Sequence, residues 1–267
     1  MTQTSIPATT HFQTDKVNRL MTNRVVLVTG ASRGIGAATA KLLAHHGAVV
    51  GVNYYSNEVA AQQVVEAIQS EGGKALAVRA DVRDKQQVES MIQQVTEAFG
   101  FIDTLVINAP FAFPFVPFLE SQWEDFEAKL LAELKAAFYS AKAVLPSMVE
   151  HKRGCIIAVS TSLSRNPSEG YSMHSTAKSG LDALMKSLAL ELGPHGIRVN
   201  VLAPGLTLTD SVAFLPQENI DAFARMVPLK RNALPEDIAG GILLLASEAA
   251  RFISGAYLPV SGGLQML

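Results

Sequence analysis

A short strand, a glycine-rich turn and a helix near the beginning of the chain constrain its fold most strongly. Residues 24–28 form a β-branched run of the kind found in buried parallel strands. The turn over residues 29–36 follows, and an Ala- and Leu-rich helix is predicted to end at His46. Its spacing, Gly30-x-x-x-Gly34-x-Gly36, is not the common dinucleotide pattern. Its position after a first strand nevertheless predicts a cradle where backbone N–H groups approach a pyrophosphate.

The same alternation of strand and helix continues to the end of the chain. Further strands are predicted over residues 48–52, 74–80, 102–107, 154–159, 197–202 and 257–260. Helices are predicted from an Asn57 cap to Glu71, over 85–99, from a Ser121–Glu124 capping box to about Met148, from Tyr171 to Leu192, and from Pro235. A segment over about 210–226 has helix character and could act as a lid. This order predicts an α/β fold with one doubly wound, Rossmann-type parallel sheet and helices on both faces.

Domain organisation and composition narrow the class of protein. Residues 1–23 are expected to be a flexible N-terminal arm, and residues 24–267 a single dinucleotide-binding domain. The 267 residues carry a net charge of −2 and are 48% hydrophobic, which makes nucleic acid or an anionic membrane an unexpected partner. The single cysteine, Cys155, allows no disulfide, and no metal site is indicated. No signal peptide and no apolar run of roughly 20 residues is present, so a cytoplasmic protein is expected.

The end of the second strand indicates the cofactor. In NAD-preferring sheets a carboxylate near this point bonds the ribose 2′-hydroxyl. Here the chain reads Asn53-Tyr54-Tyr55-Ser56, without an acid, and Arg33 in the glycine turn can supply positive charge for a 2′-phosphate. NADP(H) is therefore favoured over NAD(H). The alternative is an exposed Arg33 without a ligand.

Three groups that can hold or move a proton share one helical face. Tyr171, His174 and Lys178 are spaced by three and four residues, so they point the same way on a helix. Outside any family context, a core histidine with satisfied nitrogens is the better explanation of His174. The loop over residues 111–118, rich in phenylalanine and proline, suggests either a wall of a substrate pocket or a subunit contact.

These features together resemble the short-chain dehydrogenases/reductases over about residues 24–267, and most closely the 3-oxoacyl-[acyl-carrier-protein] reductases and related ketoreductases. The resemblance implies a homodimer or homotetramer, built through the long helix and the last strand. It also implies a set of cofactor-binding residues. These are Gly30, Ser32, Arg33, Gly34, Ile35 and Gly36 for the pyrophosphate and adenosine side, with Asn53 at the end of the second strand, Asp81 and Val82 for adenine, Asn108 and Ala109 near a ribose, Lys178 on the nicotinamide ribose, and Pro204, Gly205, Leu206 and Thr209 around the nicotinamide amide and phosphates.

The chain departs from the family pattern at four positions. His174 occupies the place of the family's tyrosine acid, Thr161 that of its serine, Glu133 that of its helix asparagine, and Pro110 that of a glycine. Lys178 should depress the pKa of His174, because like charges repel, and leave a neutral imidazole that donates a hydrogen bond. Glu133, if close, would oppose this shift and stabilise an imidazolium. Thr161 keeps a hydroxyl that can hold a substrate oxygen.

Three functions follow from this altered site. The first is NADPH-dependent reduction of a carbonyl in a small-molecule substrate, such as a 3-oxoacyl thioester or a hydrophobic ketone, through His174, Thr161 and Lys178, with help from Tyr171 or a water. The second is an enoyl-thioester reductase, because Tyr171-x6-Lys178 resembles the tyrosine–lysine spacing of the enoyl-carrier-protein reductases. The third is a cofactor-binding protein without redox turnover, with a regulatory or other non-redox role.

Overall fold

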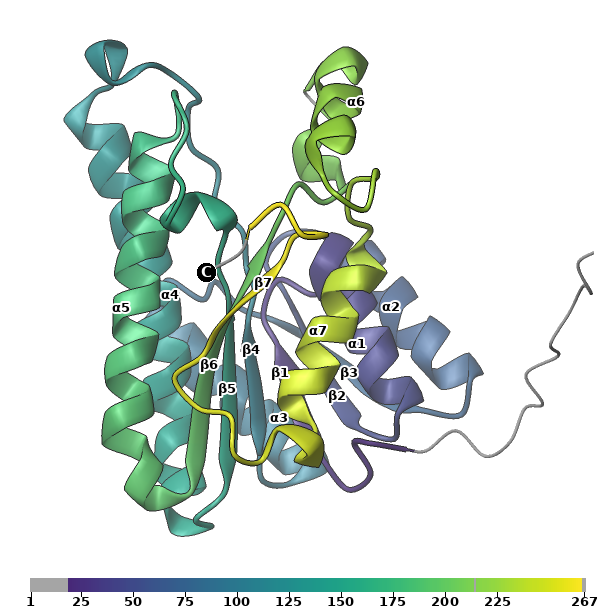
Figure 1. Cartoon of the computed structure of the whole chain (residues 1–267). Coiled ribbons are helices and arrows are strands. Elements are labelled where there is room, and N and C mark those ends of the chain that lie inside the picture. Colours follow the sequence, from purple (N-terminus) through teal and green to yellow (C-terminus); the bar gives the residue numbers. More distant parts are fainter. Residues whose placement is uncertain (1–18, 214, 266–267) are drawn as a thin grey trace, which may run out of the picture.

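Seven parallel strands form one sheet at the centre of the computed structural model, which describes residues 19–213 and 215–265. The strands are β1 (Val25–Val28), β2 (Val49–Tyr54), β3 (Lys74–Arg79), β4 (Thr104–Ile107), β5 (Gly154–Val159), β6 (Ile197–Pro204) and β7 (Tyr257–Val260). Their order in the sheet is β3-β2-β1-β4-β5-β6-β7, and every pairing is parallel (Figure 1). The predicted doubly wound sheet is therefore confirmed.

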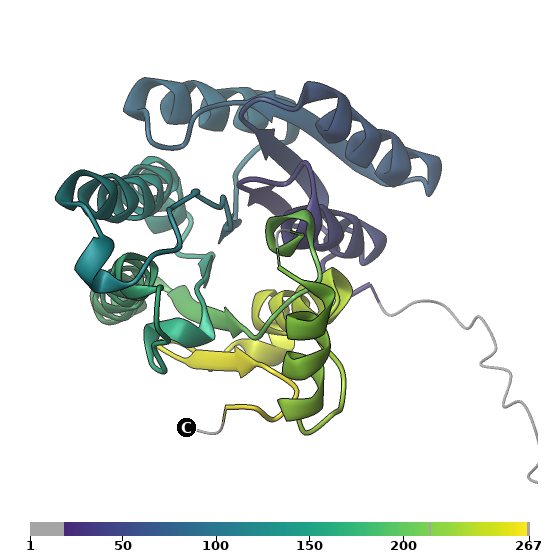
Figure 2. The ribbon, with the colours of Figure 1, turned by 90° about the horizontal axis from the view of Figure 1, so that it is seen from above.

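Helices cover both faces of this sheet, as Figures 1 and 2 show. One face carries α1 (Gly34–His45), α2 (Glu58–Ser70) and α7 (Pro235–Ala246), and the other carries α3 (Lys85–Phe99), α4 (Trp123–Glu150) and α5 (Ser172–Leu192). A further helix, α6 (Gln217–Met226), stands beyond the sheet edge and buries none of its described side chains. The predicted helical segment over 210–226 thus contains α6 and a short 3-10 turn (Asp210–Val212), while residue 214 lies outside the described residues.

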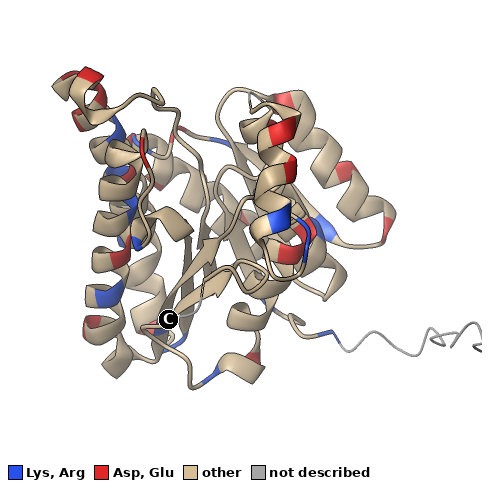
Figure 3. Ribbon diagram, turned by 45° about the horizontal axis from the view of Figure 1, so that its top comes forward, with Lys and Arg blue, Asp and Glu red and all other residues tan. Residues whose placement is uncertain are grey.

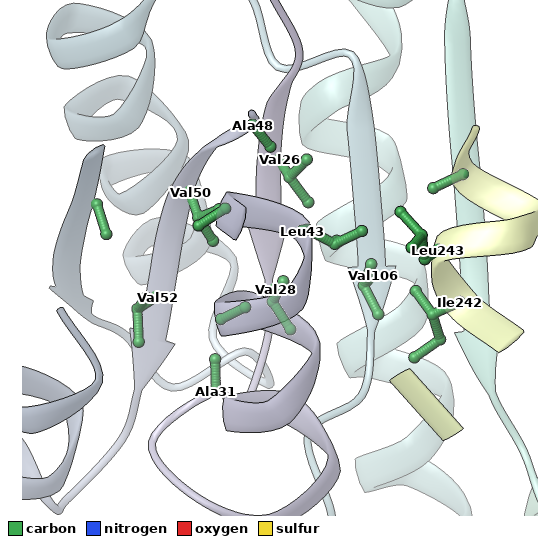
Figure 4. Close-up of a cluster of buried hydrophobic side chains, with 14 of the residues drawn as sticks. Val26, Val28, Ala31, Leu43, Ala48, Val50, Val52, Val106, Ile242 and Leu243 are labelled. Atoms are coloured by element: carbon green, nitrogen blue, oxygen red, sulfur yellow. The ribbon is translucent and has the colours of Figure 1, made fainter. Parts of the chain in front are cut away.

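The core is divided by the sheet into two halves. Val26 and Val28 of β1 pack into the half under α1, α2 and α7, whereas Leu27 packs into the half under α3, α4 and α5. Figure 4 shows the first half, where Leu43 of α1 and Ile242 of α7 lie over valines of β1 and β4. Because successive strand side chains point to opposite faces, a strand covered on both sides must be apolar at every position. This explains the uninterrupted β-branched runs in the sequence.

The predicted boundary between arm and domain is wrong for residues 19–23. Met21 is fully buried in the first half of the core, and its backbone N–H donates to the carbonyl oxygen of His46 at 3.0 Å. The turn before β1 is therefore part of the packed domain, because the core needs an apolar side chain where α1 ends. Residues 1–18 of the expected arm lie outside the described residues.

The predicted helix caps have different outcomes. Asn57 caps α2 as expected, because its side chain accepts from the backbone N–H of Ala60 at 3.0 Å. The capping box at Ser121 is wrong. The Ser121 hydroxyl instead donates to the carbonyl oxygen of Phe118 at 2.8 Å and closes the 3-10 turn Phe118–Glu120. Helix α4 consequently begins at Trp123, without a side-chain cap.

The charge and the hydropathy of the helices do not indicate a particular kind of binding partner. Figure 3 shows Lys and Arg positions interspersed with Asp and Glu positions over the helices. Among the described helices, none is long and apolar enough to cross a membrane.

Candidate active site

The site predicted from the sequence lies where the strands end at one edge of the sheet. Strands β1 and β4 are neighbours, although β2 and β3 lie between them in the chain. The connections therefore leave in opposite directions at this point, and ligands of open α/β sheets bind in the crevice that results. The glycine turn follows β1, Asn108 follows β4, Thr161 follows β5, and Gly205 follows β6.

The glycine turn requires glycine at two positions. Gly30 has φ +62°, and a Cβ atom there would lie 2.6 Å from the Cα atom of Ala109. Gly36 lies in the first turn of α1, where a Cβ atom would lie 2.4 Å from the carbonyl oxygen of Gly30 and 2.6 Å from Nδ2 of Asn108. The absence of these side chains leaves the backbone of the turn bare, as the approach of a pyrophosphate requires.

Asn108 and Asn53 hold this turn from two sides. Asn108 Nδ2 donates to the carbonyl oxygens of Thr29 and Gly30 at 3.0 and 3.1 Å. Asn53 Oδ1 accepts from the N–H of Gly30 at 3.0 Å, while its Nδ2 donates to the carbonyl oxygen of Ala80 at 3.1 Å. Asn53 was expected among the cofactor-binding residues, and its side chain is engaged here with the main chain. This buried amide is occupied by backbone groups and acts as a support for the turn.

The region predicted to bind adenine contains an arginine that the sequence prediction missed. Asp81 accepts from the backbone N–H and the guanidinium of Arg83, at distances of 2.7 to 3.2 Å, and this arginine lowers the pKa of the Asp81 carboxyl. Arg83 also lies 5.7 Å from the ring centroid of Tyr55. The side chain of Val82 is buried in the second half of the core, so only its main chain could face adenine.

The segment after β6 lies against the glycine turn. A Cβ atom on Gly34 would lie 3.3 Å from the methyl group of Thr209, and the guanidinium of Arg33 lies 3.6 Å from the carboxylate of Asp210. Other predicted residues of this region are held by the main chain or the core. The N–H of Gly205, after Pro204, donates to Val260, Leu206 accepts from Ala233, Ser32 is half-buried, and Ile35 packs against the first half of the core.

Lys178 lies in a buried cluster with two other charged groups. Its ammonium donates to the carbonyl oxygen of Val159 at 2.9 Å and lies 3.0 Å from Oε2 of Glu133. The other carboxylate oxygen of Glu133 accepts from Lys129 at 2.7 Å. Two ammonium groups thus share one carboxylate, and they lower the pKa of Glu133 against the opposing effect of burial. Lys129 was missed because charged residues four apart on a helix usually form an exposed pair.

His174 is neutral in this environment. Burial, and then the ammonium groups of Lys129 and Lys178, lower the pKa of His174 to about 3. The predicted direction is confirmed, with burial as the larger cause. The alternative of an imidazolium stabilised by Glu133 is wrong, because that carboxylate is bound to the two lysines.

The ring of His174 is well packed, but one of its nitrogens has no hydrogen-bond partner. It stacks on the ring of Phe113, with centroids 4.7 Å apart and planes 7° apart. Nδ1 is buried without a hydrogen-bond partner. A core histidine with satisfied nitrogens is therefore not what the structure shows. A proton on Nε2 leaves only a lone pair at the buried nitrogen.

Tyr171 and Thr161 are the two hydroxyl-bearing residues predicted for catalysis. The ring of Tyr171 lies 4.8 Å from that of Phe115 and 6.3 Å from that of His174. Burial raises the pKa of Tyr171, so its phenol stays protonated. The hydroxyl oxygen of Thr161 accepts from the N–H of Leu163 at 3.3 Å, which leaves its proton able to donate. The loop over residues 111–118 therefore forms an aromatic wall beside the groups predicted for catalysis.

The residues present fit a dinucleotide. The bare backbone of the turn, its support by Asn108, and the ammonium of Lys178 at the end of β5 match the expected cradle. Among the described residues, no group of three or more His, Cys, Asp or Glu side chains could hold a metal ion. Fold and site together define a Rossmann-type protein with an altered group of proton-handling residues.

Comparisons with known proteins agree with this class of fold. The family described as enoyl-(acyl carrier protein) reductase matches residues 30–265. An L-rhamnose 1-dehydrogenase (NAD(P)(+)) from a Sphingomonas species is 38% identical over 251 residues, covering 92% of this chain and 98% of its own. A 3-oxoacyl-[acyl-carrier-protein] reductase from a Synechocystis species is 38% identical over 247 residues, with the same two coverages. The crystal structure of a dehydrogenase/reductase from Sinorhizobium meliloti 1021 has a TM-score of 0.86 and 34% identity, covering 93% of this chain and 98% of its own.

The chain belongs to the short-chain dehydrogenase/reductase family and is an oxidoreductase of that type, with 3-oxoacyl-[acyl-carrier-protein] reductases among its relatives. Its nucleotide cofactor is of the NAD(P)(H) type.

Proposed function

We propose that the protein is an NADPH-dependent reductase of a carbonyl group in a hydrophobic small molecule, such as a 3-oxoacyl thioester or a related ketone. The observation that carries this proposal is neutral His174, which stacks on Phe113 of the aromatic wall and lies within the field of the buried ammonium of Lys178. That ammonium donates to Val159, two residues before Thr161. Similarity to 3-oxoacyl-[acyl-carrier-protein] reductases supports the substrate class.

The roles of the residues follow from their protonation states. Bound NADPH would supply the hydride to the carbonyl carbon. Thr161 and the N–H of neutral His174 donate hydrogen bonds that hold the carbonyl oxygen, and the charges of Lys178 and Lys129 favour negative charge developing there. Because the pKa of His174 is about 3, almost no imidazolium is present near neutral pH to transfer a proton. The proton for the oxygen comes from water or from the phenol of Tyr171.

Preference for NADPH is supported at the other end of the cradle. No carboxylate occupies positions 53–56, and Arg33 is exposed beside the glycine turn. Asp210 pairs with this guanidinium and would compete with a 2′-phosphate. We expect Arg33→Ala to weaken NADPH binding about tenfold while NADH binding changes little, because one charge-assisted contact is lost. Isothermal titration with both cofactors measures this, and equal binding of the two by the parent protein would refute the preference.

An enoyl-thioester reductase is the second candidate. The specific observation in its favour is the free phenol of Tyr171, which burial keeps protonated and which lies against Phe115 of the aromatic wall. In this reaction the phenol would protonate an enolate after hydride addition to the double bond. The match to the family described as enoyl-(acyl carrier protein) reductase is compatible with it.

One experiment separates these functions. NADPH consumption is followed with 3-oxoacyl thioesters, enoyl thioesters and ketones for the parent protein, His174→Phe and Tyr171→Phe. Loss of turnover in His174→Phe with retention in Tyr171→Phe supports carbonyl reduction, whereas the opposite pattern with enoyl substrates supports the second candidate. Tight NADPH binding without turnover of any substrate by the parent would contradict both and leave a non-redox role.

A further inference from the structure

Lys129 is a buried charged residue that makes contacts not used by the chemistry above. Its side chain is only 2% exposed, and lysines are almost never so buried unless they are paired. The ammonium donates to Oε1 of Glu133 and to the main-chain carbonyl oxygen of Phe111, both at 2.7 Å. It therefore joins the buried carboxylate of α4 to the first residue of the aromatic loop over residues 111–118.

The same ammonium also faces the aromatic ring that covers His174. Nζ of Lys129 lies 5.0 Å from the ring centroid of Phe113 and 6.0 Å from that of Phe111. An ammonium within about 6 Å of a ring face is attracted by the ring quadrupole. Phe113 in turn stacks on His174. Lys129 thus contacts both the main chain of the loop and the ring on which the imidazole rests.

The arrangement of charges allows the contact between Lys129 and the loop to be removed without disturbing Lys178, which is expected to bind the cofactor. Glu133 offers one carboxylate oxygen to Lys129 and the other to Lys178. If Lys129 loses its ammonium, Glu133 and Lys178 remain a one-to-one pair, and Lys178 keeps its bond to Val159. The loop, by contrast, loses the bond to Phe111 and the cation over Phe113.

We propose that Lys129 is a positioning residue that ties the aromatic loop to the Glu133–Lys178 pair and so holds Phe113 against His174. The link shapes the apolar wall that meets the substrate. The part of the proposal that concerns substrate rests on the proposed function, whereas the link between Lys129 and the loop does not.

The test compares Lys129→Met with Lys135→Met in the full-length protein. Lys135 lies on the exposed side of α4 and forms no ion pair among the described residues. Hydrogen exchange of residues 109–118 without ligands should be about tenfold faster in Lys129→Met, because a charge-assisted hydrogen bond that closes the loop is removed. Lys135→Met should match the parent, and Lys129→Arg should recover part of the protection because it keeps a charged donor.

Kinetics give the second measurement. In Lys129→Met, KM for a medium-chain 3-oxoacyl thioester should rise about tenfold, while the Kd for NADPH stays within about twofold of the parent value. Unchanged loop exchange in a folded Lys129→Met, or a loss of NADPH affinity as large as the rise in KM, overturns the proposal.

A second variant covers failure of Lys129→Met to fold. Phe113→Leu removes the ring beneath the ammonium but leaves the bonds to Phe111 and Glu133, and should give the same rise in KM with native circular dichroism. A parent-like KM in this variant overturns the proposal. Exchange is measured without substrate, so faster exchange in Lys129→Met supports the link between Lys129 and the loop even if the parent protein reduces no carbonyl substrate. An active parent protein with unchanged exchange in Lys129→Met refutes the role of Lys129 but not the proposed function.

Discussion

The imidazole of His174 shows that the position of a residue in a family pattern does not determine its protonation state or its chemistry. Its place in the chain is that of the family's tyrosine acid, yet it is neutral, stacked on Phe113 and unpartnered at Nδ1. Burial is the main reason, because moving the charged form out of water is costly. A histidine in this state donates a hydrogen bond well but is a weak source of protons near neutral pH.

The lowered pKa of His174 makes the stability of the protein dependent on pH. Between pH 6.5 and about 3 the unfolded chain binds a proton at this site that the folded protein does not. Stability therefore rises with pH across this window and is lost as pH falls. From pH 7 to pH 5 the contribution is a loss of up to about 2 kcal/mol. Urea unfolding at the two pH values measures it.

His174→Phe is the control for this pH dependence. The variant keeps a ring that can stack on Phe113 but has no proton to bind, so its loss between pH 7 and pH 5 should be smaller than that of the parent by about the same amount. Carboxylates titrate alike in both proteins. Equal losses in the two proteins would show that His174 is charged in the folded state.

Glu133 is expected to matter more for stability than Lys129. Glu133→Gln leaves two ammonium groups buried without a carboxylate, whereas Lys129→Met leaves a balanced pair with Lys178. We expect a loss of about 3–5 kcal/mol for the first change and about 1–3 kcal/mol for the second. Urea unfolding curves of both variants measure the difference, and a larger loss for Lys129→Met would contradict this ranking.

Among the elements, the glycine turn was the easiest to predict and α4 the hardest. The turn follows a strand and precedes a helix, so its role can be predicted from the local sequence. Helix α4 has apolar residues at helical spacing, such as Leu134 and Phe138, and these suggested its core or contact face. The face that is buried most deeply instead carries Lys129 and Glu133 beside small residues such as Ala137. The partners of these two charged groups outside α4 come from α5 and the aromatic loop, which no helical pattern can reveal.

The close packing of the turn predicts the effect of a single methyl group. Gly30→Ala should weaken NADPH binding by at least about tenfold, because the new Cβ atom would meet the backbone of Ala109 at 2.6 Å and the left-handed conformation adds about 1–2 kcal/mol of strain. Isothermal titration measures the affinity. Gly72→Ala is the control, since Gly72 has φ +80° and no atom within 4 Å of its Cβ position. It should lose stability but bind NADPH as the parent does, and similar affinities for both variants would contradict the steric argument.

The whole molecule leaves apolar side chains exposed on the layer formed by α4 and α5. Phe138 is 52% exposed and Leu190 is 81% exposed, and exposed apolar surface of this kind often marks a contact between subunits. We propose that the protein forms a homodimer or homotetramer through this layer, with the edge strand β7 as a second contact.

Self-association is measured by light scattering after gel filtration. Phe138→Glu should reduce the apparent mass to that of a smaller assembly, because a carboxylate cannot be buried unpaired in an apolar contact. Val59→Glu is the control, since Val59 is 70% exposed on α2 in the opposite layer. A monomeric parent protein, or an assembly unchanged by Phe138→Glu, would refute the proposed contact.

The sequence by itself determined the architecture of this protein. Hydrophobic period, turn residues and the order of elements act over a few neighbouring residues, so they predict the parallel sheet, its helices and the glycine turn. The resemblance placed His174, Thr161 and Glu133 at the family's catalytic positions. It could not state their protonation or their contacts.

Only the tertiary structure decided how these groups are used. The neutral state of His174 depends on burial under Phe113 and on two lysines from different helices. Glu133 is bound by Lys129 and Lys178, and the amide of Asn53 is taken up by backbone groups. Such properties arise from distances between segments far apart in the chain and from the water that packing excludes, and electrostatic energies depend on both.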